Sequence, residues 1–443
     1  MFTSNLFGSD FVWGAAAASY QTEGAWNTDG KGQSVWDVFT HKKGKIKTGE
    51  NGDSATEFYT RYTEDLKLVK EMGMNAFRFS ISWSRVLPDG TGEVNRAGLD
   101  FYHKVIDTCL ELGIVPWITL YHWDLPQKLE EQGGWTNRKI LDWFEKYVDL
   151  ITSEYGSKVR NWMVLNEPMV FTGFGYMTGL HAPGRKGLGN FLPAVHHATL
   201  AQAIGARMIR KNVDNVNIGT TYSCSYIEPA SQSKKDIEAA ARIDALHNRI
   251  FIEPVLGLGY PTDTLPLLKK LKKYQLPGDD KLAQFDFDFI GIQTYFRTIA
   301  KYAWVPYLWA KEIPADKRGV LHNEMIGEVY PEGIYHLLKK FAAYKHVHKI
   351  YVTENGACFP DVLENGRVHD AQRVKYFQDY LNQTLRAKNE GVPLEGYFAW
   401  SLTDNFEWAE GYRTRFGLVH VDFATQKRTL KDSALWFKDF LKK

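Results

Sequence analysis

Residues 56–83 read TEFYTRYTEDLKLVKEMGMNAFRFSISW, and this stretch joins two different hydrophobic patterns. In residues 56–73 the apolar side chains recur at helical spacing, and Gly73 stands where such a helix would stop. Residues 75–83 are instead almost continuously apolar, as in a strand that is buried on both faces of a parallel sheet. The stretch therefore predicts a helix that leads directly into a buried strand. The residues on the predicted apolar face are Phe58, Tyr59, Tyr62, Leu66, Val69 and Met72.

The same two patterns alternate along the whole chain. Eight short runs are rich in Val, Ile, Phe and Trp, and amphipathic stretches separate them. The predicted strands are 11–18, 75–83, 115–121, 160–168, 216–223, 288–296, 349–356 and 394–402. Besides 56–73, predicted helices begin near Ala97, Arg138, Pro193, Lys234, Pro331, Ala371 and Lys431.

Eight strand–helix units predict an α/β fold, because strict alternation requires a parallel sheet with right-handed crossovers, and eight such units can close into a barrel. No linker or shift in composition divides the chain. We therefore expect residues 1–443 to form a single (β/α)8 TIM barrel, with long βα loops forming a pocket at the carboxyl-terminal face. The structural alternative is a doubly wound open sheet, but its G-x-G-x-x-G motif is missing after the first run.

Composition excludes several classes of protein. Among 443 residues, 54 Lys and Arg stand against 52 Asp and Glu, so the net charge of +2 gives no reason to expect a nucleic-acid partner. We expect no membrane segment and no secretory signal, and hence a cytoplasmic location. Cys109, Cys224 and Cys358 are far apart and form no CxxC, which favours a reducing compartment and no cysteine-bound zinc. The pair His196-His197 lacks accompanying ligands and predicts helix packing or a surface position instead of a metal site.

The polar residues that end the apolar runs are the candidates for chemistry, because a barrel builds its active site at the carboxyl ends of its strands. Two of them, Glu167 and Glu354, are carboxylates. Each of them, considered alone, could be the buried partner of an arginine as readily as a catalytic group. We expect the fourth and seventh strands to lie on opposite sides of the ring, so that the carboxylates face each other. Such a pair suits cleavage of a glycosidic bond. Arg78 would lower the pKa of a neighbouring carboxylate, and the Tyr295 hydroxyl could donate to it.

At VLNEP (164–168), YVTENG (351–356) and YFAWSLTDNFEWAEGYRTRFGL (397–418), the sequence closely resembles family 1 glycoside hydrolases, the β-glucosidase and β-galactosidase family. The resemblance runs from FVWGAAAASYQTEGAW (11–26) to RFGLVHVDF (415–423), which is nearly the whole chain. It implies a single (β/α)8 barrel and a retaining enzyme that cleaves β-glycosides by double displacement, without cofactor or metal.

Residue by residue, the resemblance implies that Glu167 is the general acid/base and that Glu354 is the nucleophile. It implies that Trp400 lies under the sugar ring and that Phe416 is an apolar neighbour of its C6. From its position in the sequence, Tyr295 is expected to contact Glu354 beside the substrate. No role is assigned to Gln293. The expected ligands of the sugar hydroxyls are Gln21, His122, Asn166, Glu407 and Trp408.

Substrate preference follows from single positions. The glutamate of the NFEW motif is Glu407 in this chain, and its negative charge would repel a phosphate. Relatives that cleave 6-phosphorylated sugars resemble this chain at its other motifs but have a different residue in place of this glutamate. The sequence also departs from the family pattern at positions on the leaving-group side and around the catalytic residues. Met169 stands where Trp is common, Gln293-Thr294-Tyr295 where Asn-Tyr-Tyr is common, and Ile326-Gly327 where Gly-Trp is common.

We therefore predict a retaining, exo-acting β-glucosidase that hydrolyses terminal, non-reducing, unphosphorylated β-D-glucosyl residues. Its expected substrates are small saccharides such as cellobiose and aryl or alkyl β-glucosides, with side activity on β-galactosides and β-fucosides. A homo-oligomer is compatible with the sequence. Two alternatives are a non-catalytic sugar-binding protein, which the presence of both glutamates disfavours, and an enzyme in which transfer to another sugar outcompetes water.

Overall fold

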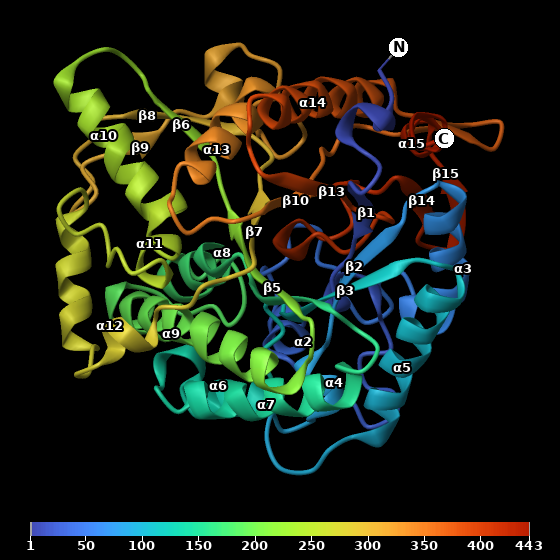
Figure 1. The fold of residues 1–443 in the computed structure, drawn as a ribbon, viewed down its shortest axis with the longest axis horizontal. Helices are drawn as coiled ribbons and strands as arrows, with labels where there is room; N and C mark the ends of the chain where they lie inside the picture. Colours follow the sequence, from blue (N-terminus) through green and yellow to red (C-terminus); the bar gives the residue numbers. More distant parts are fainter. Residues whose placement is uncertain (1, 443) are drawn as a thin grey trace.

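The computed structural model describes residues 2–442, and within them eight parallel strands close into a barrel (Figure 1). Around the ring the order is β1-β13-β10-β7-β5-β4-β3-β2. Each predicted apolar run contains one of these strands, so the predicted barrel is confirmed. The strands are β1 (Val12–Ala16), β2 (Ala76–Ser80), β3 (Val115–Tyr121), β4 (Asn161–Asn166), β5 (Asn217–Ser223), β7 (Phe289–Gln293), β10 (Ile350–Asn355) and β13 (Leu394–Trp400).

Large side chains fill the inside of the barrel, which explains why the runs are apolar on both faces. Trp117 packs against Phe289 and Phe398, with ring centroids 5.6 and 5.3 Å apart. Glycines on neighbouring strands make room for these rings, since a Cβ at Gly219 would lie 2.3 Å from Phe289. The barrel is therefore closed by its own packing, and any ligand has to bind at one of its ends.

Helices surround the barrel, with α3 and α5 on one side and α7 and α9 on another (Figure 1). The predicted helices are all present, although α9 begins five residues before Pro193. The longer helices are α3 (Phe58–Glu71), α5 (Arg96–Glu111), α7 (Ile140–Tyr155), α9 (Leu188–Asn212), α10 (Lys234–Asp244), α13 (Glu332–Ala342), α14 (Ala371–Asn389) and α15 (Asp432–Phe440). The shorter ones are α1 (Ser19–Thr22), α2 (Val35–Thr40), α4 (Trp83–Val86), α6 (Gln127–Glu131), α8 (Pro168–Thr172), α11 (Ile252–Val255) and α12 (Asp279–Leu282).

Many of the residues outside the barrel strands and the surrounding helices form long loops after the strands. The loops after β5 and β7 share a small sheet of β6 (Tyr226–Pro229), β8 (Arg297–Lys301) and β9 (Lys311–Glu312). Two further hairpins pair β11 (Val362–Glu364) with β12 (Arg367–His369), and β14 (Val419–Asp422) with β15 (Lys427–Leu430).

Phe2 packs on Phe440 of α15 with ring centroids 5.2 Å apart, which joins the first described segment to the last helix. In the part of the chain that the structure describes, no helix is long and apolar enough to cross a membrane.

Candidate active site

Glu354, at the carboxyl end of β10, lies buried within a set of hydrogen-bond donors. Arg78 on β2 forms a salt bridge with its Oε1 atom, and Gln293 Nε2 donates to the same oxygen at 3.0 Å. The Tyr295 hydroxyl donates to Oε2 at 2.6 Å. These donors hold the carboxylate in one orientation, as a group that must approach a reacting atom along one line requires.

Glu167 has quite different surroundings. It directly follows β4 and caps α8 with φ at +46°, a left-handed conformation that is strained for a residue with a Cβ. It is buried, it forms no salt bridge with any side chain in residues 2–442, and its Oε1 atom has no hydrogen-bond partner. The backbone thus places a carboxyl group with one unpartnered oxygen, and with no cationic partner among the described residues, at the cavity described below.

The expected placement of the two carboxylates on opposite sides of the ring is wrong. Only β5 and β7 separate β4 from β10 in one direction, whereas four strands separate them in the other. Strand order along the chain matches order around the ring, so the fourth and seventh strands are three steps apart and not four. Both side chains nevertheless line the same cavity.

Asn166 connects the two carboxylate strands to His122. Its Oδ1 atom accepts hydrogen bonds from Arg78 and from Gln293, the latter at 2.8 Å. Its amide nitrogen therefore faces His122 Nε2, 3.0 Å away. Because this nitrogen donates, Nε2 of a neutral His122 accepts, and the proton of the ring is on Nδ1, which has no partner. His122 thus carries a buried Nδ1 donor without a partner, and its ring lines the cavity described below.

Glu407 and Trp408 close the other side of the site, on the loop that follows β13. Gln21, at the start of the chain, donates to Glu407 Oε2 at 3.2 Å and to the backbone oxygen of Phe406 at 3.0 Å, so its own Oε1 stays unpartnered. His122 lies between two indoles, with ring centroids 6.0 Å from Trp400 and 5.8 Å from Trp408. Aromatic rings and polar side chains therefore surround the same space.

That space is a cavity of about 260 Å³ at the carboxyl ends of the strands. Its volume lies just below the ~300–1,000 Å³ of typical small-molecule pockets, which suits one small ring-shaped ligand. Buried polar atoms of Gln21, His122 and Glu167 have no partner in or beside it, and a ligand with several hydroxyl groups would satisfy them. The lining residues are His122, Trp123, Glu167, Phe174, Tyr295, Phe296, Asn323, Met325, Glu354, Trp400, Glu407, Trp408 and Phe416.

Comparison with known proteins identifies the family of this chain. The family model of glycosyl hydrolase family 1 matches residues 3–443. The chain belongs to glycosyl hydrolase family 1. Over 438 residues it is 43% identical to β-glucosidase A of Thermotoga maritima, and over 441 residues it is 44% identical to β-glucosidase A of Acetivibrio thermocellus; each match covers 98% of both chains. The solved structure of the T. maritima β-glucosidase in complex with deoxynojirimycin superimposes with a TM-score of 0.96 at 41% identity, covering 100% of this chain and 99% of that one.

The surroundings of the two glutamates separate their pKa values in this family 1 hydrolase. Burial and the negative charge of Glu354 raise the pKa of Glu167 well above its ordinary value. Burial also raises the pKa of Glu354, and Arg78 and Tyr295 lower it only in part. The prediction that Arg78 lowers the pKa of a neighbouring carboxylate is confirmed in direction, although burial outweighs the guanidinium and the pKa of Glu354 is raised overall. Glu354, with the smaller rise, ionises before Glu167.

Two other groups in the site have shifted pKa values. Burial, followed by the positive charge of Arg78, lowers the pKa of His122 well below its ordinary value, so the ring is neutral at neutral pH. Burial, followed by the charge of Glu354, raises the pKa of Glu407 to about 8. Three carboxyl groups thus share this space, and within residues 2–442 only Glu354 among them forms a salt bridge, with Arg78, so the site retains protons into the neutral range.

Sequence reasoning left one functional position unassigned. Gln293 donates from one nitrogen to both Glu354 and Asn166, so it ties the two carboxylate strands together. Its place at the end of β7 was the signal that could have identified it. His196 and His197 take no part in the site; His196 Nε2 lies 2.8 Å from Asp279, and His197 Nδ1 lies 2.8 Å from the backbone oxygen of Trp135.

Proposed function

We propose that this protein is a retaining, exo-acting β-glucosidase that hydrolyses terminal, non-reducing, unphosphorylated β-D-glucosyl residues. One observation carries the proposal: two buried carboxyl groups line the same cavity, and only one of them is held by a cation. A nucleophile has to be ionised and oriented, and a general acid has to keep its proton near neutral pH. Glu354 meets the first condition and Glu167 the second.

In the first step, a Glu354 oxygen attacks the anomeric carbon and forms an ester with the sugar. The bond from that carbon to the leaving oxygen breaks, and Glu167 transfers its proton to this oxygen. The negative charge of Glu354 disappears in the ester, so one cause of the raised pKa of Glu167 disappears as well. Glu167 is then a carboxylate that accepts a proton readily.

In the second step, Glu167 takes a proton from a water molecule, and the water oxygen attacks the anomeric carbon. The ester bond breaks, and its electron pair restores the Glu354 carboxylate. Two displacements at one carbon return the original anomeric configuration. The free Glu167 oxygen and the strained turn that directs it suit these two proton transfers.

The polar atoms around the cavity support glucose as the bound sugar. His122 and Glu407 line the cavity, the Oε1 atom of Gln21 has no partner, and the Asn166 amide lies 3.0 Å from His122, so these polar side chains can serve sugar hydroxyl groups. The faces of Trp400 and Trp408 can cover the C–H groups of the ring. A pocket that holds one terminal sugar tolerates some of its epimers, which supports side activity on β-galactosides and β-fucosides.

Two further features support an unphosphorylated substrate and a reducing compartment. The described lining holds no Lys or Arg, so a 6-phosphate dianion would find no cation there to bind and would lie in the same cavity as the Glu354 carboxylate. Cys109, Cys224 and Cys358 are all free and buried, which is compatible with the proposed cytoplasmic location.

Kinetics on a panel of nitrophenyl β-glycosides test the proposal. The β-glucoside, β-galactoside and β-fucoside should all be hydrolysed, with the highest kcat/KM for the β-glucoside. The corresponding 6-phospho-β-glucoside should not be hydrolysed. Proton NMR during the reaction should show the β-anomer of glucose as the first product. Tight binding without turnover would favour a sugar-binding protein, and an α-anomeric first product would refute the double displacement.

A further inference from the structure

Six charged side chains form a buried network that connects the loops after β10 and β13 with the starts of α14 and α15. Three of them are acidic and three are basic, so their charges balance. Five of the side chains are at most 3% exposed, and the sixth is 25% exposed. None of the six lines the cavity of the candidate active site. The members are Asp361, Asp370, Arg373, Asp404, Arg415 and Lys431.

Asp404, in the loop after β13, holds both neighbours of a residue that lines the cavity. Its Oδ1 atom accepts hydrogen bonds from Lys431 Nζ at 2.7 Å and from the backbone N–H of Gly417 at 3.0 Å. Its Oδ2 atom accepts one from the Arg415 guanidinium at 2.7 Å. Burial raises the pKa of Asp404, but the charges of Lys431 and Arg415 bring it below its ordinary value, so the group stays ionised. The residue between Arg415 and Gly417 is Phe416, whose ring lines the cavity.

Arg373, in the first turn of α14, connects the same place to the strand of the proposed nucleophile. Its Nε atom donates to the backbone oxygen of Ala357 at 3.0 Å, three residues after Glu354. Another nitrogen of the same guanidinium donates to the backbone oxygen of Arg415 at 2.7 Å. One rigid side chain therefore fixes the segment after Glu354 relative to the segment before Phe416.

Phe416 in turn contacts a side chain that orients the proposed nucleophile. Its ring meets the Tyr295 ring edge-on, with centroids 6.0 Å apart and an angle of 82° between the planes. The Tyr295 hydroxyl donates to Glu354 Oε2 at 2.6 Å. A misplacement of about 1 Å at a reacting group can lower a rate about 10²-fold. The position of Phe416 therefore matters for the geometry of Glu354.

We propose that Asp404 is a positioning residue: by holding both neighbours of Phe416, it keeps this ring, and through it Tyr295, in place beside Glu354. The inference rests on the proposed β-glucosidase activity and adds to it a residue that lies outside the cavity. Stability alone explains the network poorly, because apolar residues of similar volume often stabilise a fold equally well or better than buried ion pairs.

A second buried ion pair provides a matched control. Asp65 on α3 and Arg428 on β15 have side chains that are 0% and 2% exposed, and two nitrogens of Arg428 donate to the carboxylate at 2.9 and 3.1 Å. Neither residue lines the cavity. Asp65→Asn therefore leaves an arginine without its buried counter-charge, as Asp404→Asn does, at a place that does not hold Phe416.

Kinetics of the two variants test the proposal, at a temperature well below their unfolding temperatures. KM for nitrophenyl β-glucoside and Ki for deoxynojirimycin do not depend on how many molecules are folded, so loss of folded protein alone changes neither. Asp404→Asn should raise both constants about three- to tenfold and lower kcat/KM about tenfold or more, because the misplaced ring disturbs the site. Asp65→Asn should leave KM and Ki within twofold. The proposal is overturned if both constants stay within twofold in Asp404→Asn, or rise equally in Asp65→Asn.

A milder variant keeps the test decisive if Asp404→Asn does not fold. The Arg415 side chain is 25% exposed, so Arg415→Gln disturbs less buried charge and removes one of the bonds that hold Phe416. It should raise KM and Ki about three- to fivefold relative to the unaltered protein. Values within twofold would overturn the proposal.

The failure of the proposed function would look different. In that case, the unaltered protein would not hydrolyse nitrophenyl β-glucoside at all. If the unaltered protein hydrolyses it and Asp404→Asn behaves like Asp65→Asn, the β-glucosidase activity stands and the positioning role of Asp404 is refuted.

Discussion

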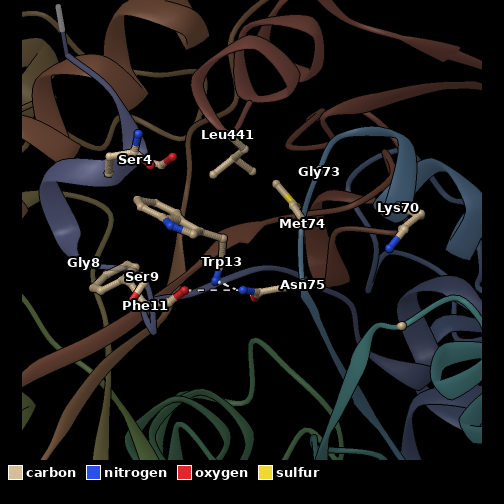
Figure 2. Close-up of a pocket in the computed structure, with 12 residues that line it drawn as sticks. Ser4, Gly8, Ser9, Phe11, Trp13, Lys70, Gly73, Met74, Asn75 and Leu441 are labelled. Carbon is tan, nitrogen blue, oxygen red and sulfur yellow. Dashed lines mark hydrogen bonds between the residues drawn. The ribbon is translucent and has the colours of Figure 1, made fainter. Parts of the chain in front are cut away.

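The two ends of the barrel each hold a cavity of almost the same size, but the chemistry of the two cavities differs. The cavity at the amino ends of the strands measures about 250 Å³ and the one at the carboxyl ends about 260 Å³. The first lies where β1, β2 and β3 begin, beside the last residues of the chain (Figure 2). It is lined by Ser4, Asn5, Gly8, Ser9, Phe11, Trp13, Lys70, Gly73, Met74, Asn75, Gly113 and Leu441.

The cavity at the amino end leaves no buried polar side-chain atom of its described lining without a partner. Asn75 accepts a hydrogen bond from the backbone N–H of Trp13 at 2.9 Å and donates to the backbone oxygen of Phe11 at 3.4 Å (Figure 2). No described residue of that lining has a buried polar side-chain atom without a partner, whereas His122 and Glu167 at the carboxyl end have one each. Unsatisfied buried groups, and not volume, therefore distinguish a candidate active site from a structural void.

The largest expected effect comes from Glu354→Gly at the carboxyl end. Removal of the nucleophile should lower kcat for nitrophenyl β-glucoside by several orders of magnitude, because no covalent intermediate can form. Thermal unfolding should show that the variant is folded. A variant that keeps more than about a tenth of the activity would contradict the assigned role.

The next largest effect is expected for Glu167→Gln. Loss of the proton donor should lower kcat/KM for methyl β-glucoside about 10²- to 10⁴-fold, and less for an aryl glucoside, whose leaving group needs little protonation. In the unaltered enzyme, activity should fall as rising pH removes the proton from Glu167, whose pKa is raised. A pH–rate profile of the variant should lack this alkaline fall, and persistence of the fall would assign it to another group.

Glu407→Gln should have a smaller effect on activity and an effect on stability that depends on pH. Kinetics should show kcat/KM for glucosides falling about 10- to 100-fold through a lost hydrogen bond in a buried site. Folding raises the pKa of this carboxyl from 4.5 to about 8, so the unfolded chain ionises first and the folded state loses stability between those pH values. The variant lacks this loss, and its unfolding temperature relative to the unaltered protein should therefore rise from pH 5 to pH 8. A constant difference across this range would refute the buried, protonated Glu407.

The smallest effect on activity is expected at the amino end. Asn75→Ala removes two hydrogen bonds to the backbone and should lower the free energy of unfolding by about 1 kcal/mol. Chemical denaturation should detect this change, while kcat/KM should stay within about twofold. If activity fell tenfold with stability unchanged, the two cavities would not differ in the way their hydrogen bonds indicate.

Much of the fold could be predicted because the decisive information is local. Buried parallel strands are apolar on both faces, and this pattern located all eight barrel strands to within a few residues. The polar residues that end them, including Glu167 and Glu354, followed from the rule that barrel sites form at carboxyl ends.

What could not be predicted depends on contacts between distant segments. The role of Gln293 requires its nitrogen to lie between β4 and β10. The hydrogen bond that Asn323 Oδ1 accepts from the backbone within its own turn is likewise visible only in three dimensions. The net rise in the pKa of Glu354 reflects a balance between burial and Arg78 that the residue types alone do not determine.

Trapping the covalent intermediate tests the central claim most directly. The protein is incubated with a 2-fluoro-β-glucoside that carries a reactive leaving group, digested, and analysed by mass spectrometry. The account predicts a 2-fluoroglucosyl ester on the Glu354 side chain, within the peptide that contains YVTENG. A label on another residue, or rapid turnover with no labelled peptide at all, would contradict it.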